Sequence, residues 1–376
     1  MYWYYHKRKK IDLLILLMKI LITAPSLNAT QNISGVSTVV NTIIKHNKAN
    51  QYFHYLLGRP DKELSKLIWL GQFLQQILLF PFVLKQNKID LVHQNLPFDP
   101  KGVLREFFIN LWCRLLHAPV VLHVHGGVFL MNGTTNIIFK KLAQSLFKHS
   151  KQVLILSELE KEALQKHYQY SEAIVLYNSI DTSYYANKQN ELAKTKPTLL
   201  FLGRIHESKG VDDLIEALRL LKQKMDFRFL LCGIGPLKDH FISECNDILV
   251  SDFEYHGIVS GDEKLNIIKE ANFFLLPSRY GEGLPMAMLE TMAAGVVPVV
   301  TDDASMKFVV QHEINGIRVN KNDPKDLFEK LDYIINQPEL YKLLSENARK
   351  TIAEKYDIKK YVIKLNKIYQ SALNQY

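Results

Sequence analysis

Residues 276–285 read LPSRYGEGLP, and this stretch decides which fold the sequence favours. It follows the apolar run 273–276 and leads into a helical pattern that begins at Pro285, a residue type favoured in the first turn of helices. Free backbone amides at such a helix start, here around Gly283 and Leu284, suit an anionic phosphate group. A buried strand, a glycine-rich loop and a helix in this order predict an α/β sheet with a phosphate site at a strand end.

The same alternation of short apolar runs and amphipathic stretches continues on both sides of this unit. The runs are rich in valine, isoleucine and leucine, as buried parallel strands are. A polar stretch at 187–196 separates two sets of them. We therefore expect two Rossmann-like domains, each a doubly wound parallel sheet, which face a cleft where ligands bind. The strand candidates are 20–23, 91–93, 120–125, 153–157 and 173–176, then 199–202, 227–231, 253–256, 273–276 and 297–300.

The pattern also predicts where the parts of the chain begin and end. Translation could begin at Met18 instead of Met1, because a buried first strand starts there. The apolar run 11–22 is shorter than the roughly 20 residues of a transmembrane helix, so we expect a cytoplasmic protein, with a short membrane-surface anchor as the alternative. The predicted parts are a tail or mis-assigned start (1–17), a first domain (18–190), a second domain (191–360) and a C-terminal helix that can cross back to the first domain (361–376).

Composition and charge narrow the class of protein. A chain that is 47% hydrophobic and 23% charged is globular. Its 3 cysteines include no CxxC pair, which argues against a disulfide framework and a cysteine-based zinc site. Residues 1–190 carry 22 basic and 11 acidic side chains, whereas residues 191–376 carry 25 and 27, so the net charge of +9 comes from the first half. An excess of this kind suggests an anionic partner for that half.

The second half holds the candidate ligand-binding residues. Arg204 and Lys209 follow a predicted strand, where two cations could clamp a diphosphate; solvated surface charges are the alternative. Glu282 lies in the glycine-rich loop, and Glu290 lies eight residues later among apolar neighbours. A carboxylate beside a phosphate cradle can bind ribose hydroxyls, and a loop carboxylate can bind sugar hydroxyls. The pair of glycines in 231–236 is a weak phosphate signal and fits a plain turn as well.

These motifs in combination resemble the nucleotide-sugar site of the retaining glycosyltransferases of family 4 (group 1). The resemblance is strong over residues 197–320 and weaker before them. One departure is the segment 295–298, which has one residue more than the commonest Gly-x-Pro form. The motifs are the Glu-x7-Glu spacing within 278–290, MAAG at 292–295, PVV at 298–300, the turn at 201–210, HG at 256–257 and NG at 315–316.

The resemblance implies the GT-B fold, in which the second domain holds the donor. It implies that the enzyme needs no metal and no other cofactor, and that a nucleotide-diphosphate sugar is the donor substrate. In agreement with this expectation, the chain contains no Asp-x-Asp pattern. Cations and a helix dipole would then stabilise the leaving nucleotide. The implied contacts are Arg204 and Lys209 with the diphosphate, Glu290 with the ribose, Glu282 with the transferred sugar, and the amides of Gly283 and Leu284 with the distal phosphate.

In the first half, the motif LHVHGG at 122–127 ends a predicted strand at the cleft. Alternate residues of a strand share a face, so His123 and His125 point to one side. The alternative to a functional role is that they are simply two polar residues at the edge of the sheet. A metal site formed by this pair would need a third ligand. The motif resembles the strand-end His-Gly of the family and places His125 near the reacting sugar. The loop NISGV at 32–36 resembles the family's glycine loop, so Gly35 is expected near the donor phosphate or the acceptor.

Two stretches of the first half suggest a partner. Residues 101–117 and 128–148 interleave aromatic and aliphatic residues with lysine and arginine, which suits an anionic membrane surface. An amphipathic core helix with a basic solvated face is the alternative. We expect no nucleic-acid partner, because no helix-turn-helix, zinc-finger or RNP pattern occurs. Family enzymes that build envelope polysaccharides imply a glycan or lipid-linked saccharide acceptor and a place at the inner face of the membrane.

The resemblance therefore implies a retaining, metal-independent hexosyltransferase. It would move a sugar from a nucleotide-diphosphate sugar to a hydroxyl of a growing glycan in cell-envelope polysaccharide biosynthesis. The alternatives are an inverting GT-B transferase, a nucleotide-sugar epimerase, or a non-catalytic membrane-associated binding protein. The sequence leaves open the base and sugar of the donor, the acceptor and linkage, and the oligomeric state.

Overall fold

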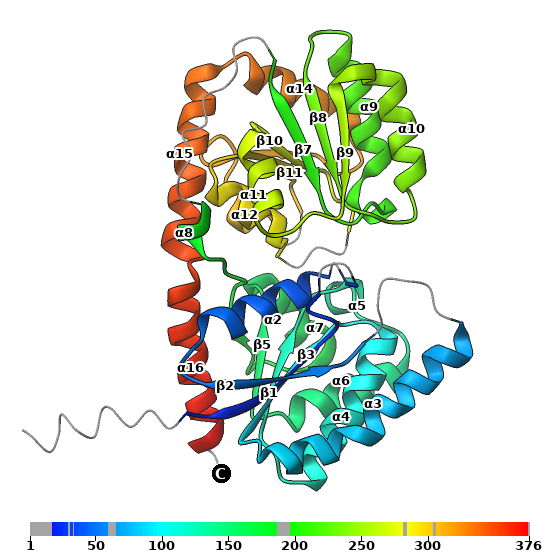
Figure 1. Ribbon diagram of the computed structural model, residues 1–376, viewed down its shortest axis with the longest axis vertical. Coiled ribbons are helices and arrows are strands. Elements are labelled where there is room, and N and C mark those ends of the chain that lie inside the picture. The colour runs from blue at the N-terminus through cyan, green and yellow to red at the C-terminus, as the bar shows by residue number, and fades with distance from the viewer. Residues whose placement is uncertain are drawn as a thin grey trace, which may run out of the picture.

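The chain forms two α/β domains stacked along the long axis of the molecule (Figure 1). The computed structural model describes residues 17–28, 31–32, 34–58, 65–185, 196–280, 284–303 and 306–374. Each domain is built on a six-stranded sheet in which all pairs of neighbouring strands are parallel. The prediction of two doubly wound parallel sheets is confirmed.

The first sheet has the strand order β2-β1-β3-β4-β5-β6. The sequence pattern did not predict β2, because this edge strand is partly exposed along its length and mixes aromatic and polar residues instead of being uniformly aliphatic. Its strands are β1 (Lys19–Ala24), β2 (Gln51–Leu56), β3 (Leu91–Leu96), β4 (Val120–Val124), β5 (Gln152–Ile155) and β6 (Ile174–Val175).

Helices cover both faces of this sheet. α3 packs beside α4 and α4 beside α6 on one face, while α2 lies on the other face together with the C-terminal helix (Figure 1). Side-chain caps set several of the helix starts; Ser34, for example, accepts a hydrogen bond from the amide of Ser37. The helices are α2 (Gly35–His46), α3 (Lys66–Asn87), α4 (Pro100–Leu115), α5 (Val128–Met131), α6 (Ile137–Lys148), α7 (Glu158–Tyr168) and α8 (Thr182–Tyr185).

The second sheet has the order β12-β11-β10-β7-β8-β9, so the strand order reverses between β10 and β7. Ligands of such sheets bind beside this switch point. Its strands are β7 (Thr198–Leu202), β8 (Arg228–Cys232), β9 (Phe253–Gly257), β10 (Phe273–Leu276), β11 (Val297–Thr301) and β12 (Ile317–Val319). Its helices are α9 (Val211–Lys222), α10 (Lys238–Leu249), α11 (Gly261–Glu270), α12 (Met286–Ala293), α13 (Met306–Val309) and α14 (Pro324–Ile335), with short 3₁₀ turns at Glu207–Lys209 and Val250–Asp252.

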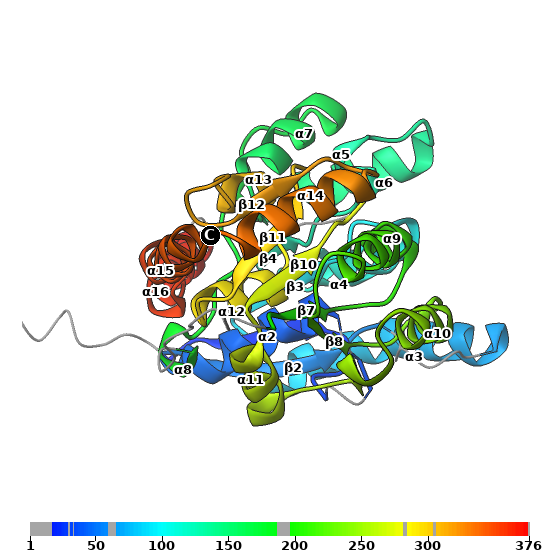
Figure 2. The same cartoon turned by 90° about the horizontal axis from the view of Figure 1, so that it is seen from above.

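Two long helices, α15 (Pro338–Lys355) and α16 (Ile358–Asn374), run along one flank of both domains (Figures 1 and 2). α15 packs on α12 and β11 of the second domain, and α16 packs on α2 and β4 of the first. The break between them is tied to the first domain, because Ile180 donates a backbone hydrogen bond to Tyr356 and accepts one from Ile358. One hydrophobic cluster therefore continues from the second domain into the first.

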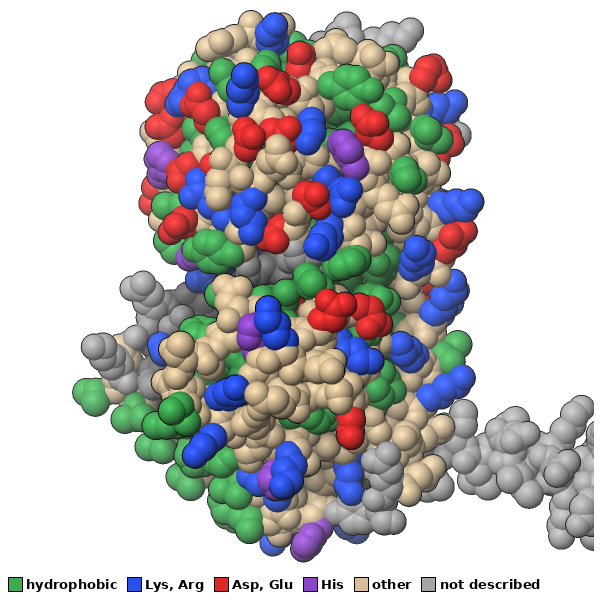
Figure 3. Space-filling model, turned by 180° about the vertical axis from the view of Figure 1, so that it is seen from behind, with side chains coloured by type: hydrophobic (Ala, Val, Ile, Leu, Met, Phe, Trp, Pro, Cys, Tyr) green, Lys and Arg blue, Asp and Glu red, His purple; other side chains and the backbone are tan. Residues whose placement is uncertain are grey.

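The two domains differ in surface chemistry. Figure 3 shows acidic and basic side chains mixed over the upper, second domain, whereas hydrophobic and basic side chains gather at the lower left, on the first domain. Within the described residues, no helix combines the length and apolar composition that crossing a membrane requires.

Candidate functional site

A cleft of about 790 Å³ lies between the domains, where the carboxyl ends of strands from both sheets meet. Leu202, Cys232 and Leu276 at the ends of β7, β8 and β10 line it from the second domain. Two predicted site residues, Glu282 and Gly283, lie outside the described residues. The cleft is lined by the other six predicted residues, which are Gly35, His125, Arg204, Lys209, Leu284 and Glu290.

The glycine turn after β8 packs directly on the loop after β7. A Cβ atom on Gly233 would lie 1.8 Å from the carbonyl oxygen of Gly203, and one on Gly235 would lie 2.0 Å from that of Ile205. Backbone hydrogen bonds join the two loops, with the Ile205 amide 2.9 Å from the carbonyl oxygen of Ile234. These glycines thus act through close backbone packing, in agreement with the plain-turn interpretation of this motif.

Arg204 and Lys209 lie on the loop that this packing supports. Arg204 is exposed just after β7, and Lys209 precedes Gly210, which begins α9 at a φ of +69°. A Cβ atom on Gly210 would lie 2.0 Å from the carbonyl oxygen of Pro277, so a glycine lets this loop touch the loop after β10. The two cations are therefore carried by backbone that is braced from two sides.

An ion pair that the sequence did not reveal fixes the loop after β10. The guanidinium of Arg279 donates to both carboxylate oxygens of Asp213, at 2.9 and 2.8 Å, and its backbone amide donates to Ser208 at 2.8 Å. The hydrogen bonds to Asp213 raise the pKa of Arg279. Asp213 lies in the first turn of α9. Arg279 holds the start of the 278–290 motif against α9.

Glu290 is only 5% exposed, so its carboxylate is not an ordinary surface charge of α12. Lys264 of α11 donates to its Oε1 at 2.7 Å. Tyr185 of α8 also bonds to this carboxylate, and burial together with the charge of Glu290 raises the pKa of the Tyr185 hydroxyl. Helices from both domains therefore hold the carboxylate at the cleft. Neither Lys264 nor Tyr185 carries a local sequence signal, since they meet Glu290 only in the folded chain.

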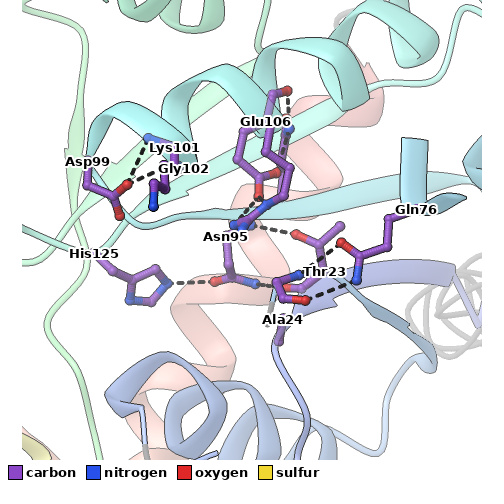
Figure 4. Close-up of polar contacts among 12 residues, drawn as sticks. Thr23, Ala24, Gln76, Asn95, Asp99, Lys101, Gly102, Glu106 and His125 are labelled. Atoms are coloured by element: carbon purple, nitrogen blue, oxygen red, sulfur yellow. Dashed lines mark hydrogen bonds and ion pairs between the residues drawn. The ribbon is translucent and has the colours of Figure 1, made fainter. Parts of the chain in front are cut away.

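His125 follows β4 on the opposite side of the cleft. Its Nε2 lies 2.6 Å from Oδ1 of Asn95, whose Nδ2 donates to the carbonyl of Thr23 at 2.8 Å (Figure 4). Because that contact fixes which end of the amide accepts, Nε2 of His125 carries the proton and Nδ1 is an acceptor. Burial lowers the pKa of His125 to about 3, so the ring is neutral near pH 7. Neutral His125 can position a sugar hydroxyl.

Behind His125 a buried polar chain reaches the C-terminal helix. The rings of His123 and His125 lie 4.3 Å apart, as expected for side chains on one face of a strand. Nδ1 of His123 is 3.3 Å from Nε2 of His93, whose Nδ1 is 2.6 Å from the hydroxyl of Tyr369 in α16. Burial lowers the pKa of both His93 and His123. Among the described residues, no group of three His, Cys, Asp or Glu side chains could hold a metal ion.

Two further contacts shape the cleft on the first-domain side. Asn178, which is buried, donates to the carbonyl of Leu284 at 3.0 Å and so ties the first domain to the start of α12. Gly35 is the first residue of α2 at the cleft, and a Cβ atom there would meet nothing within 4 Å. Unlike Gly233, Gly35 is therefore not required by backbone packing.

Two Rossmann-like domains that face a cleft define the GT-B class, and comparison with known proteins supports this assignment. The structure resembles that of HepE from Anabaena in complex with UDP and glucose, with a TM-score of 0.74 over 94% of this chain and 100% of that chain, at 16% identity. A family model described as Glycosyltransferase Family 4 matches residues 34–184, and one described as Glycosyl transferases group 1 matches residues 186–351. The chain belongs to glycosyltransferase family 4 (group 1).

Relatives of similar length agree. An uncharacterised glycosyltransferase from Methanocaldococcus jannaschii is 28% identical over 90% of this chain and 95% of its own length. The UDP-Gal:α-D-GlcNAc-diphosphoundecaprenol α-1,3-galactosyltransferase of Escherichia coli is 24% identical over 81% of this chain and 81% of its own length. The protein is thus a glycosyltransferase with the GT-B fold.

Proposed function

We propose that this glycosyltransferase is a retaining, metal-independent hexosyltransferase of cell-envelope polysaccharide biosynthesis. It transfers a sugar from a nucleotide-diphosphate sugar to a hydroxyl of a growing glycan. The observation that supports the proposal most strongly is the single cleft that brings Arg204, Lys209 and buried Glu290 of the second domain opposite neutral His125 of the first.

In this proposal each group acts on one part of the donor. Arg204 and Lys209, on the braced loop, bind the diphosphate, and the backbone amides of Gly283 and Leu284 add the dipole of α12. Glu290 accepts hydrogen bonds from the ribose hydroxyls, with Lys264 sharing the carboxylate. Glu282 is assigned to the transferred sugar from the family resemblance. UDP-sugars are the first donors to test, because the galactosyltransferase relative is named for UDP-Gal and HepE binds UDP.

The proposed reaction is a same-face substitution at the anomeric carbon. The bond from this carbon to the phosphate oxygen breaks, the acceptor oxygen bonds on the same face, and the acceptor proton passes to the leaving phosphate. No protein base is needed for this step, which is consistent with a neutral His125 that positions a hydroxyl. The cations stabilise the charge that develops on the leaving diphosphate.

The acceptor is proposed to be lipid-linked. The galactosyltransferase relative acts on a saccharide carried by diphosphoundecaprenol, and the first domain of the present chain carries the basic excess. Such an acceptor places the enzyme at the inner face of the cell membrane.

The test combines donor binding with product stereochemistry. UDP-, GDP- and ADP-sugars are screened by thermal shift, since a ligand that binds the native state stabilises it. The stabilising donor is then incubated with lipid-linked and soluble saccharide acceptors, and the anomeric configuration of the product is read by NMR. Retention supports the proposal; inversion, or donor epimerisation without transfer, contradicts it. Unchanged turnover of a folded Glu282→Ala variant would remove Glu282 from the site.

A further inference from the structure

Helix α3 exposes a continuous stripe of large apolar side chains. The stripe recurs every three or four residues, so its members share one face of the helix. Their exposed fractions range from 45 to 83%, values that are unusual for leucine and phenylalanine in such number. We call this stripe the outer α3 face; it consists of Leu67, Leu70, Leu74, Leu78 and Phe82.

An adjoining side of the same helix packs on the domain. Ile77, Phe80 and Leu84 are buried in the hydrophobic cluster beneath α3 and α4. An apolar inner face is enough to attach a surface helix to its sheet, and the described part of the chain leaves the outer α3 face exposed. Contiguous exposed apolar surface of this kind marks an interaction site.

The surface that surrounds the outer α3 face is apolar and basic. Leu104, Phe108 and Leu115 of the neighbouring helix α4 are also exposed, and the patch appears at the lower left of Figure 3. The one carboxylate within α3, α4 and α6 is Glu106, which is fully buried and paired with Arg105 at 2.9 Å. The basic residues of these helices whose side chains the structure describes are Lys85, Lys101, Arg105, Arg114, Lys140, Lys141 and Lys148.

We propose that the outer α3 face docks the protein on an anionic phospholipid bilayer, with the side chains of this face inserted among the lipids and lysines against the headgroups. Lysine is depleted in the cores of protein–protein interfaces, whereas apolar and basic side chains together match a negatively charged membrane surface. This inference rests on the proposed function for its purpose, which is access to a lipid-linked acceptor.

The docked orientation brings the cleft to the membrane. The carboxyl ends of the strands face the cleft, and a crossover helix such as α3 runs antiparallel to the strands it joins, so α3 begins on the cleft side of the first domain. A bilayer that contacts the outer α3 face is therefore close to the cleft, where a saccharide on a membrane-bound carrier can enter.

The test is flotation of the full chain with vesicles of phosphatidylcholine alone or mixed with phosphatidylglycerol, at low and high salt. We expect binding to the anionic vesicles that weakens at high salt. Combined Leu74→Gln, Leu78→Gln and Phe82→Gln substitutions should weaken this binding about a hundredfold or more, because apolar insertion is lost. The three side chains are exposed, so the variant should fold.

A matched control changes equally exposed apolar residues elsewhere, namely Phe308→Gln, Leu343→Gln and Ile363→Gln. This control should bind vesicles like the wild type. A second pair separates charge from insertion: Lys85→Gln with Lys88→Gln should weaken binding to anionic vesicles roughly tenfold and leave weak binding to neutral vesicles unchanged. Lys342→Gln with Lys350→Gln, on exposed positions of α15, should have little effect.

Several results would overturn the docking proposal. The first is that the wild type does not bind anionic vesicles at low salt. The second is that the apolar control loses as much binding as the α3 variant. The third is that light scattering shows a dimer for the wild type and a monomer for the α3 variant. The last would assign the face to a second copy of the chain. Donor-induced thermal shift and transfer to a soluble acceptor, measured without vesicles, keep the two proposals separate. If the thermal shift and the transfer persist while the protein does not bind vesicles, only the docking proposal is contradicted. If the wild type binds vesicles but binds no donor, only the proposed function is contradicted.

Discussion

The two domains share a fold but differ in their balance of charged side chains. In the second domain, basic side chains are nearly matched by acidic ones, and many are paired, as Arg228 is with Glu254 and Glu270. In the first half, 22 basic side chains meet 11 acidic ones, so the acidic side chains of that half can balance at most half of its cations. A small anionic ligand needs a few cations at fixed positions, whereas an extended anionic surface needs a field. This difference matches the two proposals, in which the second domain binds a small anionic donor and the first domain docks on an extended anionic surface.

The largest effect is expected at Glu290, the carboxylate on which the donor side of this comparison depends. Glu290→Gln removes the charge that we propose accepts ribose hydroxyls, and it weakens the contact with Lys264, so kcat/KM for the donor should fall about a hundredfold to a thousandfold. Steady-state kinetics and nucleotide titration measure this effect. Glu339→Gln, at an exposed position of α15, is the control. Unchanged kinetics in a folded Glu290→Gln variant would show that the donor binds elsewhere.

The second prediction compares the effect on stability of substituting one glycine in each domain. Gly233→Ala places a Cβ atom 1.8 Å from the Gly203 carbonyl oxygen at a backbone φ of +136°, so both loops must shift. The free energy of unfolding should fall by about 3 kcal/mol. Gly35→Ala is the control, because its Cβ atom meets nothing within 4 Å and it should change stability by under about 0.5 kcal/mol. Chemical denaturation measures both, and equal losses would contradict the braced-loop description.

The histidines at and behind the cleft should make the stability of the first domain dependent on pH. The pKa of His93 and of His125 is about 3 in the folded chain, below the ordinary value of 6.5, so the unfolded chain binds more protons between these values. Stability is therefore lost as pH falls through 6.5, by on the order of 2 kcal/mol for each of these histidines between pH 7 and pH 5. Denaturant midpoints across this range measure the slope, and a flat profile in the wild type would contradict it.

Glu160 is expected to change the stability with pH in the opposite direction to the histidines. Burial raises the pKa of its carboxyl to about 7, so the folded chain holds a proton that the unfolded chain has released above its ordinary value of 4.5. This group stabilises the fold as pH falls from 7 toward 4.5, which opposes the histidines. Glu160→Gln should thus steepen the acid-side loss, whereas His149→Asn, at an exposed position, should leave the slope unchanged.

The smallest effect is expected where the C-terminal helix meets the first domain. Tyr369→Phe removes the hydroxyl that lies 2.6 Å from Nδ1 of His93 and leaves the ring packed in place. The free energy of unfolding should fall by about 1 kcal/mol. Tyr333→Phe, at an exposed position of α14, is the matched control. If Tyr369→Phe loosens α16, hydrogen exchange should rise there and not in α15; equal exchange in both helices would argue against a local contact.

Much of the secondary structure of this protein can be predicted from local sequence. Short aliphatic runs and amphipathic stretches predict both sheets, because burial on two faces demands an apolar strand, and the 278–290 motif predicts the loop that leads into α12. Edge strand β2 was not predicted, because a partly exposed strand does not need to be apolar on both faces. The apolar composition of α3 predicts a helix, but which of its side chains remain exposed depends on how α3 packs on the sheet.

Only the tertiary structure brings distant residues into the site. Lys264 and Tyr185 at Glu290, Asn95 at His125, and Asn178 at Leu284 are joined across 26 to 106 positions of sequence or across the two domains. Such contacts leave no periodic signal, because each partner is compatible with its own helix or loop without the other. The crossing of α16 to the first domain, which connects Tyr369 to the histidines behind the cleft, is of the same kind. Local sequence specifies the elements and the donor motif, and packing decides which side chains meet there.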